Sequence, residues 1–109
     1  MGEHGRVDVS TTLVVVPAFN EEDTVGTVVH RARSHGFDVL VVDDGSTDAT
    51  ARAAMAAGAR VLRIPVNLGV GAALHCGFRY AVSHGFERVV HVDADLQHDP
   101  SEIPDLLEV

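Results

Sequence analysis

Four short runs of aliphatic, mostly β-branched residues constrain the fold of this chain more than any other feature. They occupy residues 13–16, 39–42, 61–64 and 89–92. Polar residues are few within the runs, which is typical of strands that are buried on both faces of a parallel sheet. The sequence therefore predicts four strands, separated by segments long enough to form helices.

The first intervening segment, residues 22–35, has the pattern of an amphipathic helix. Its apolar side chains recur with the i, i+3, i+4, i+7 spacing of one helix face and are Val25, Val28, Val29 and Ala32. Asn20 is the expected N-cap, and Gly36 is the expected C′ residue. We expect this helix to turn its apolar face toward the sheet.

Two further segments predict helices. Residues 48–57 are rich in alanine, which favours the helical conformation. Ser46 or Asp48 is the expected N-cap of that helix, and Gly58 is expected to end it. Residues 71–83 carry the apolar positions of a third helix.

Strands and helices alternate along the chain, and a fourth helix is expected from about Pro100. Right-handed crossovers then give an α/β fold, with helices on both faces of an open, mainly parallel sheet. Residues 1–10 are expected to form a polar tail, and residues 11–109 a single domain. The fourth strand leaves an open sheet edge, so the sheet looks incomplete, and a homodimer through that edge is one way to cover it.

The charge balance excludes several functions. The chain has 16 acidic and 8 basic residues, a net charge of −8 and no lysine. A phosphate-binding P-loop and Schiff-base chemistry both require lysine. The acidic balance also argues against nucleic acid as a partner, because general binding relies on neutralising phosphates. A phosphate ligand would therefore need a metal ion.

Nothing in the sequence indicates export. Cys76 is the single cysteine, so no internal disulfide can form. Residues 1–12 lack the basic start and the apolar core of a signal peptide. No apolar run approaches the roughly 20 residues that cross a bilayer. We expect a cytoplasmic protein.

Acidic residues gather after three of the four predicted strands. Glu21 follows the first strand, Asp43 and Asp44 follow the second, and Asp93 and Asp95 follow the fourth. Ligands of open α/β sheets bind beyond the carboxyl ends of the strands, where these carboxylates would meet. Without lysine to relieve their repulsion, a divalent cation is their natural partner.

The residues after the fourth strand give the clearest metal signal. In an extended segment Asp93 and Asp95 project to the same side, and Gln97 could add a carbonyl oxygen. Oxygen ligands without thiolates favour Mg²⁺ or Mn²⁺. The simpler alternative is that Asp93 caps the strand end while Asp95 is solvated, and that His91 is a packed or hydrogen-bonded strand residue.

The acids after the second strand also have a simple explanation. Gly45 permits a tight turn, and Ser46 or Asp48 caps the following helix. Two adjacent acids point to opposite sides of the backbone, so Asp43 or Asp44 could orient a loop while the other accepts hydrogen bonds from a ligand. The later Gly-x-Gly of residues 69–71 is a weak signal for a dinucleotide, although it permits close backbone approach.

Taken together, these motifs resemble the family 2 glycosyltransferases of GT-A fold. The resemblance rests on Val-Val-Val-Pro-Ala-Phe-Asn-Glu, Val-Val-Asp-Asp-Gly-Ser-Thr-Asp, Asn-Leu-Gly and Val-Asp-Ala-Asp-Leu-Gln-His, at residues 14–21, 41–48, 67–69 and 92–98. It covers nearly the whole chain after the tail. The branch that it resembles most contains dolichyl-phosphate mannose synthases and bacterial polyprenyl-phosphate glycosyltransferases.

The resemblance implies two sets of site residues. Those expected to bind the donor nucleotide are Pro17, Phe19, Glu21, Val42, Asp44 and Asp93. Those expected to hold Mg²⁺ or Mn²⁺ against the donor diphosphate are Asp93, Asp95 and Gln97. Phe19 stands where tyrosine is often found, so a stacking surface is kept and a hydroxyl is lost.

The implied reaction is the transfer of a sugar, with inversion, from a GDP- or UDP-linked donor to an acceptor, with polyprenyl phosphate as one candidate. The resemblance implies a complete domain of about twice the length of this chain, which is within the usual range of domain sizes. Residues 11–109 would thus be the donor-binding half, without a visible catalytic base, and a longer form would work at the cytoplasmic face of a membrane. One alternative is a non-catalytic nucleotide-sugar-binding or assembly module. A lesser one is a haloacid-dehalogenase-like phosphotransferase, whose Asp-x-Asp follows the first strand and works with a later lysine.

Overall fold

The computed structural model describes residues 8–95. Four parallel strands form one sheet in the order β3-β2-β1-β4. The strands are β1 (Thr12–Ala18), β2 (Asp38–Asp44), β3 (Arg60–Ile64) and β4 (Arg88–His91), and a 3-10 turn, η1 (Val9–Thr11), precedes them. The helices are α1 (Val25–Ser34), α2 (Thr50–Ala56) and α3 (Val70–Ser83).

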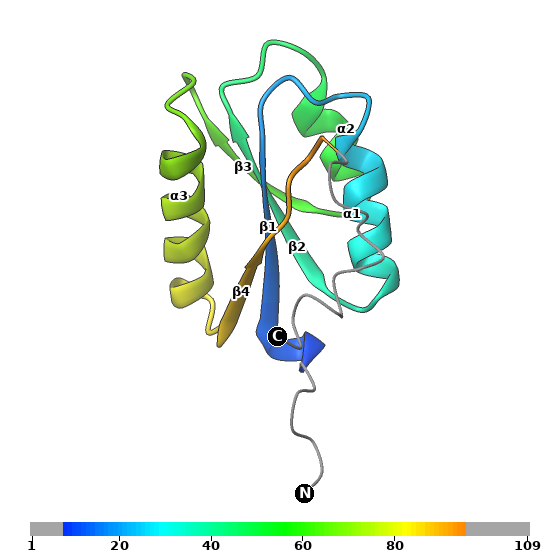
Figure 1. Ribbon diagram of the computed structural model, residues 1–109, viewed down its shortest axis with the longest axis vertical. Coiled ribbons are helices and arrows are strands. Elements are labelled where there is room, and N and C mark those ends of the chain that lie inside the picture. The colour runs from blue at the N-terminus through cyan, green and yellow to red at the C-terminus, as the bar shows by residue number, and fades with distance from the viewer. Residues whose placement is uncertain (1–7, 96–109) are drawn as a thin grey trace, which may run out of the picture.

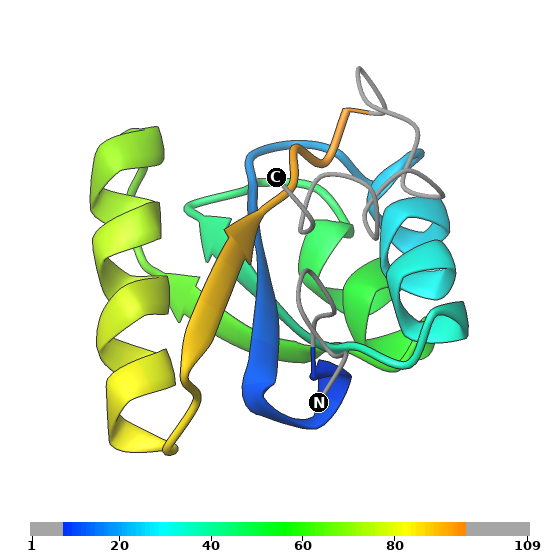
Figure 2. The ribbon, with the colours of Figure 1, turned by 60° about the horizontal axis from the view of Figure 1, so that its bottom comes forward.

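The sheet lies between two layers of helix. Helices α1 and α2 cover one face, and α3 covers the other (Figures 1 and 2). The expected α/β class is therefore confirmed, with a parallel sheet and helices on both faces. None of the helices within residues 8–95 is long and apolar enough to cross a membrane.

The two central strands hold the fold together. In β1 and β2 nearly every side chain is buried, which is why their sequences do not alternate. Burial of each Val or Leu side chain contributes about 1.5–3 kcal/mol. The outer strands β3 and β4 carry exposed residues at their ends, as their arginines and His91 show.

Alternate residues of the central strands enter different cores. On the side of α1 and α2 the core includes Val14, Val16, Val39 and Val41. On the side of α3 it includes Leu13, Val15, Leu40 and Val42. The α3 side is packed closely, because a Cβ atom placed on Gly77 would lie 2.5 Å from Cγ1 of Val15. This alternation decides which side chains reach the candidate site.

The expected ends of the first two helices are confirmed, but their expected starts are wrong, whereas α3 lies within one residue of the expected range 71–83. Gly36 and Gly58 follow α1 and α2 with φ of +93° and +101°. Helix α1 begins at Val25, after Thr24, and no side chain caps it. Asn20 therefore lies before the helix and does not cap it. Its side chain bonds instead to the Thr47 N–H in the loop after β2.

The start of α2 also differs from the expectation. This helix begins at Thr50, and Ser46 is not its cap. Asp48 does accept a hydrogen bond from the Thr50 N–H, at 2.9 Å, just ahead of the helix.

The described residues begin within the stretch that we expected to be a polar tail. Asp8 accepts a hydrogen bond from the Ser10 N–H at the start of η1, and Val9 packs against the core beneath α1. The ordered fold therefore begins before residue 11. The helix expected from Pro100 lies outside the described residues.

Candidate functional site

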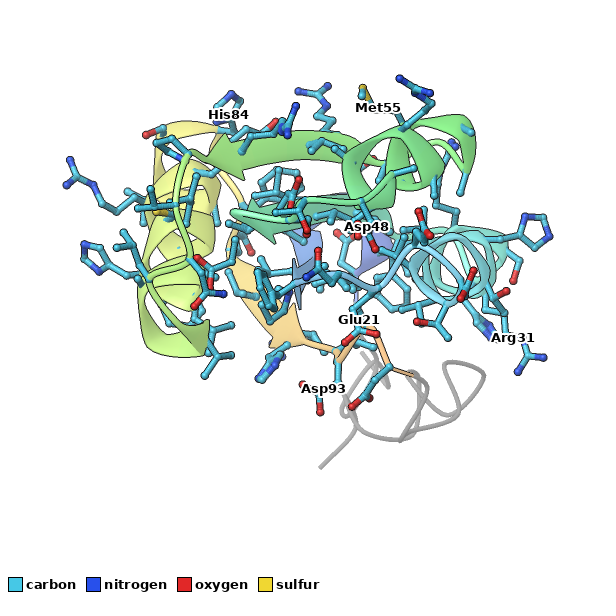
Figure 3. The ribbon with its side chains drawn as sticks, turned by 90° about the horizontal axis from the view of Figure 1, so that it is seen from above. Glu21, Arg31, Asp48, Met55, His84 and Asp93 are labelled. Atoms are coloured by element: carbon cyan, nitrogen blue, oxygen red, sulfur yellow. The ribbon has the colours of Figure 1, made fainter. Side chains whose placement is uncertain are left out.

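A pocket of about 190 Å³ opens at the carboxyl edge of the sheet. Its walls come from the last residues of β1 and β2, from the segments after β1 and β4, and from the stretch that leads into α3. The lining residues are Pro17, Ala18, Phe19, Glu21, Asp44, Asn67, Gly69, Val70, Asp93, Ala94 and Asp95. Figure 3 looks down on the molecule from this end and shows Glu21 and Asp93 on the same part of the edge.

The strand alternation explains why these side chains meet. Leu13 and Val15 lie on the α3 face of β1, and two-residue steps along that face lead to Pro17 and Phe19. The same steps lead from Val42 to Asp44 in β2. The pocket thus continues the α3 face of the sheet beyond the end of the core.

Val42 does not take the place expected of it. Its side chain is fully buried in the core under α3, one step below Asp44, and it does not line the pocket. The Val42 side chain is therefore not among those that face the pocket, and the expected contact of this residue with a base or ribose stays a prediction.

Asp44 lines the pocket but uses its carboxylate to hold a loop. Oδ1 accepts a hydrogen bond from the Leu68 N–H, and Oδ2 accepts one from the Gly69 N–H, both at 2.8 Å. The Asn67 side-chain amide lies 3.3 Å from Oδ2. The residue is 4 % exposed, so these donors replace the water that a buried carboxylate would lose. Asp44 therefore fixes the loop that forms one wall of the pocket.

Asp43 faces the other side of the sheet, away from the pocket. Oδ1 accepts a hydrogen bond from the Ser46 N–H at 3.0 Å. Oδ2 lies 3.4 Å from Nε of Arg63 and accepts no hydrogen bond within residues 8–95. Of the two adjacent acids, Asp44 thus stands at the site, while Asp43 supports the turn behind it.

The loops after β1 and β2 are joined by reciprocal hydrogen bonds. The Asn20 N–H donates to Oγ of Ser46, and Oδ1 of Asn20 accepts from the Thr47 N–H, both at 2.9 Å. The Glu21 N–H donates to Oγ1 of Thr50 at 2.9 Å. Asn20 has a φ of +52°, a conformation that asparagine adopts more readily than most residues.

The next residue pair closes this connection. The Glu22 N–H donates to Oδ2 of Asp48, and Oε1 of Glu22 accepts from the Ala49 N–H. The sequence analysis did not predict these hydrogen bonds between the two loops, because it assigned Asn20, Ser46 and Asp48 to helix caps. The available signal was that both loops, each following a buried strand, are rich in short polar side chains.

Thr24, three residues after Glu21, ties the loop after β1 to the segment after β4. The Thr24 hydroxyl lies 2.5 Å from the carbonyl oxygen of Ala94 and 3.3 Å from Oε2 of Glu21. Its single proton goes to the nearer acceptor. This contact holds the segment that carries Asp93 and Asp95 beside the loop after β1.

Asp93 and Asp95 both line the pocket, on either side of the buried Ala94. The chain turns at Ala94 and Asp95 rather than continuing as an extended strand. Oδ1 of Asp93 lies 2.9 Å from Nε2 of His91, so His91 is a hydrogen-bonded residue as expected. Gln97, the third expected ligand, lies outside the described residues.

Asp93 and Asp95 are suited to bind a divalent cation that is also coordinated by a phosphate-bearing ligand. No three His, Cys, Asp or Glu side chains within residues 8–95 are arranged as a metal-binding set. Asp93 and Asp95 nevertheless supply carboxylate oxygens at one pocket, and Mg²⁺ is commonly bound by one or two carboxylates together with substrate phosphates. A diphosphate in the pocket would complete such a set.

A larger cavity, of about 360 Å³, lies at the opposite end of the sheet and has a structural explanation. Its lining includes Arg33, Arg60, Tyr80 and His84. Arg33 lies in the last turn of α1, where a cation interacts favourably with the helix dipole, and Nδ1 of His84 lies 2.9 Å from the carbonyl oxygen of Tyr80. Arg60 donates to the Tyr80 hydroxyl at 2.8 Å. We therefore place the candidate site at the carboxyl edge.

Comparison with known families agrees with this placement. The family model for Glycosyl transferase family 2 matches residues 13–109. The chain belongs to this family. Undecaprenyl-phosphate mannosyltransferase of Micrococcus luteus is 37% identical over 88% of this chain. Dodecaprenyl-phosphate galacturonate synthase of Rhizobium johnstonii is 35% identical over 86% of it.

Solved structures of glucosyl-3-phosphoglycerate synthase from Mycobacterium tuberculosis have the same fold. The complex of that enzyme with Mn²⁺, UDP-glucose and phosphoglyceric acid has a TM-score of 0.72 and 35% sequence identity over 94% of this chain. A second complex contains Mg²⁺ and UDP and has the same TM-score of 0.72. These likenesses confirm both the resemblance and the fold class.

This family 2 chain spans less than half the length of the proteins it matches. It covers 42% of the Micrococcus relative, 30% of the Rhizobium relative and 38% of the Mycobacterium enzyme.

Proposed function

We propose that this chain forms the donor-binding part of an inverting glycosyltransferase that uses a nucleoside-diphosphate sugar. The observation that carries the proposal is the convergence of four separate sequence motifs on one pocket at the carboxyl edge. Chance would scatter such motifs over the surface, whereas open α/β sheets bind ligands at this edge. Residues 11–109 constitute the donor-binding half in this proposal.

The nucleoside would lie against the residues after β1. Phe19 is 44% exposed, and its ring offers a stacking surface for a base. Pro17 and Glu21 form the adjoining wall. We propose uridine rather than guanosine, because the related Mycobacterium structures contain UDP.

The diphosphate would lie between the loop before α3 and the segment after β4. Asp93 and Asp95, with Gln97 by resemblance, would hold Mg²⁺ or Mn²⁺ there. Such a cation neutralises the charge that develops on a departing nucleoside diphosphate. The chain's own contribution is to fix both walls: Asp44 anchors the loop before α3, and Thr24 anchors the backbone at Ala94.

We propose a phosphate-bearing acceptor, with polyprenyl phosphate as the first candidate. The Micrococcus and Rhizobium relatives are named for polyprenyl-phosphate acceptors. An anionic acceptor oxygen needs less help from a general base than a sugar hydroxyl does. A lipid acceptor would place the reaction at the cytoplasmic face of a membrane. Residues that contact the acceptor would belong to the part of the relatives that this chain does not cover.

Calorimetric titration with UDP, with and without Mn²⁺, tests the proposal. We expect Mn²⁺ to strengthen UDP binding, and Asp95→Asn to abolish most of that gain. Binding that ignores both Mn²⁺ and Asp95→Asn would contradict the proposed site. Assay of sugar transfer from UDP-glucose then separates a transferase from a non-catalytic binding module. The family assignment already opposes the phosphotransferase alternative.

A further inference from the structure

His91, the last residue of β4, contacts a residue of the candidate site. Its Nε2 lies 2.9 Å from Oδ1 of Asp93, and the two side chains are 40% and 36% exposed. The residues are two positions apart at the end of a strand, which puts them on the same face. His91 pairs with Val15 of β1, so this is the face that α3 covers and that leads to the pocket.

The backbone around Asp93 is anchored on both sides. The Val92 N–H donates to the carbonyl of Val15 at 3.1 Å, and the Thr24 hydroxyl bonds to the carbonyl of Ala94 at 2.5 Å. The Asp93 carboxylate can still rotate about its own side-chain bonds. Within residues 8–95, His91 is the side chain that the structure pairs with it. The direction of this carboxylate therefore depends on His91.

We propose that His91 is a positioning residue for cation binding. Its N–H at Nε2 would hold Oδ1 of Asp93 and leave Oδ2 free for a divalent cation shared with the donor diphosphate. This inference rests on the proposed function. Hydrogen-bond partners commonly orient metal-binding side chains, and their loss typically weakens metal binding about 10–100-fold.

Because the His91–Asp93 pair is partly exposed, an effect on metal binding can be distinguished from an effect on folding stability. A half-exposed pair of side chains contributes little to folding stability, because water competes for the same groups. Removal of the imidazole should therefore appear in metal-dependent binding and leave thermal unfolding nearly unchanged.

The test uses titration with UDP, with and without Mn²⁺, on the wild type, His91→Gln and His91→Phe. Glutamine offers an N–H donor at a reach similar to that of Nε2, whereas phenylalanine keeps a ring without a donor. We expect the Mn²⁺-dependent gain in UDP affinity to fall about tenfold or more in His91→Phe. His91→Gln should retain most of the gain, and UDP binding without Mn²⁺ should be equal in all three proteins.

The outcomes distinguish this inference from the proposed function. Equal Mn²⁺-dependent gains in the wild type and His91→Phe would overturn the role of His91 and leave the donor site standing. Equal losses in both variants, or a loss in His91→Gln alone, would show that the N–H donor is not what binding depends on and would overturn the positioning role. A large drop in unfolding temperature for His91→Phe would overturn it too, because the loss would then be structural. A wild type without any Mn²⁺-dependent gain would refute both proposals.

Discussion

At the residue scale, the site depends on a place where two loops touch through their backbones. Gly45, in the turn after β2, has a φ of +76°, and a Cβ atom placed on it would lie 2.4 Å from the Asn67 nitrogen. Asp44, the preceding residue, binds the same loop through its carboxylate. One glycine and one aspartate thus bring the loop before α3 to the edge of the sheet.

Gly45→Ala is expected to destabilise the chain by more than about 2 kcal/mol, because a left-handed conformation costs about 1–2 kcal/mol and the clash with Asn67 adds to it. Gly85→Ala is the matched control. Gly85 has a φ of +77°, nearly that of Gly45, and a Cβ atom placed on it would have no neighbouring atom within 4 Å, so this variant has a left-handed φ without the clash. Urea unfolding of both variants measures the difference, and equal losses would contradict the steric explanation.

Asp48 predicts a dependence of stability on acid pH. Partial burial raises the pKa of this carboxyl, but hydrogen bonds from Thr50 and from the Glu22 N–H outweigh it and hold the pKa below its ordinary value of 3.8. A lowered pKa in the folded state stabilises the fold above pH 3.8, and this contribution is lost as the pH falls through the lowered value.

Comparison of the wild type with Asp48→Asn isolates this contribution. The difference in unfolding free energy should be small in strong acid, should grow as the pH rises toward 3.8, and should stay constant well above it. Denaturant unfolding at a series of pH values gives the curve. A difference that is the same at every pH would contradict the account.

At the element scale, α3 approaches the sheet closely enough to require glycine. A Cβ atom on Gly77 would lie 2.5 Å from Cγ1 of Val15, and Val15 is fully buried. The helix therefore depends on Gly77 for its distance from β1. Its first turn lines the pocket at Val70, so a displaced helix would also change the site.

Gly77→Ala is expected to cost about 1–3 kcal/mol through overpacking, against a gain of about 0.5–1 kcal/mol in helix propensity. Gly71→Ala, in the same helix, has open space around the added methyl group and should cost nothing. Thermal or urea unfolding of the pair gives the net effect. If Gly77→Ala is as stable as Gly71→Ala, α3 can move away from β1 at no cost, which would contradict the close packing described here.

Elements were easier to predict than their contacts. The four strands and three helices within residues 8–95 follow from aliphatic runs, helical spacing of apolar residues and alanine content, all of which depend on each segment's own sequence. The helix starts did not, because Asn20 and Ser46 bond to each other's loops, more than 20 residues away in the chain. A polar residue near a helix looks the same in sequence whether it caps that helix or joins two loops.

The candidate site shows the same limit. Strand ends predicted that Glu21, Asp44, Asp93 and Asp95 would share one edge, and the pocket contains all of them. Sequence reasoning predicted a buried strand at residues 39–42, but not that the pocket begins one step beyond Val42, at Asp44. The His91 contact with Asp93 was also outside its reach, because side-chain rotamers are set by packing between segments.

At the scale of the whole molecule, the two ends of the sheet have different chemistry. The carboxyl end carries the pocket with its carboxylates, and the amino end carries the cavity with Arg33, Arg60 and His84. Parallel strands produce this polarity, since all of them point the same way.

The free side of β4 supports one further prediction. Within residues 8–95, β4 pairs with β1 alone, so its other edge has no strand beside it. A homodimer through this edge remains a prediction. Light scattering over a range of concentrations should then give twice the chain mass of 11.6 kDa, and a constant single mass would contradict it.

The most direct test of the central claim is an NMR measurement of where Mn²⁺ with UDP binds, with Mg²⁺ and UDP as the diamagnetic reference. We expect paramagnetic broadening to be strongest for the backbone amides of residues 18–21, 67–69 and 94–95, and to be absent near Arg33, Arg60 and His84. Broadening centred on the amino end of the sheet, or spread evenly over the molecule, would contradict it.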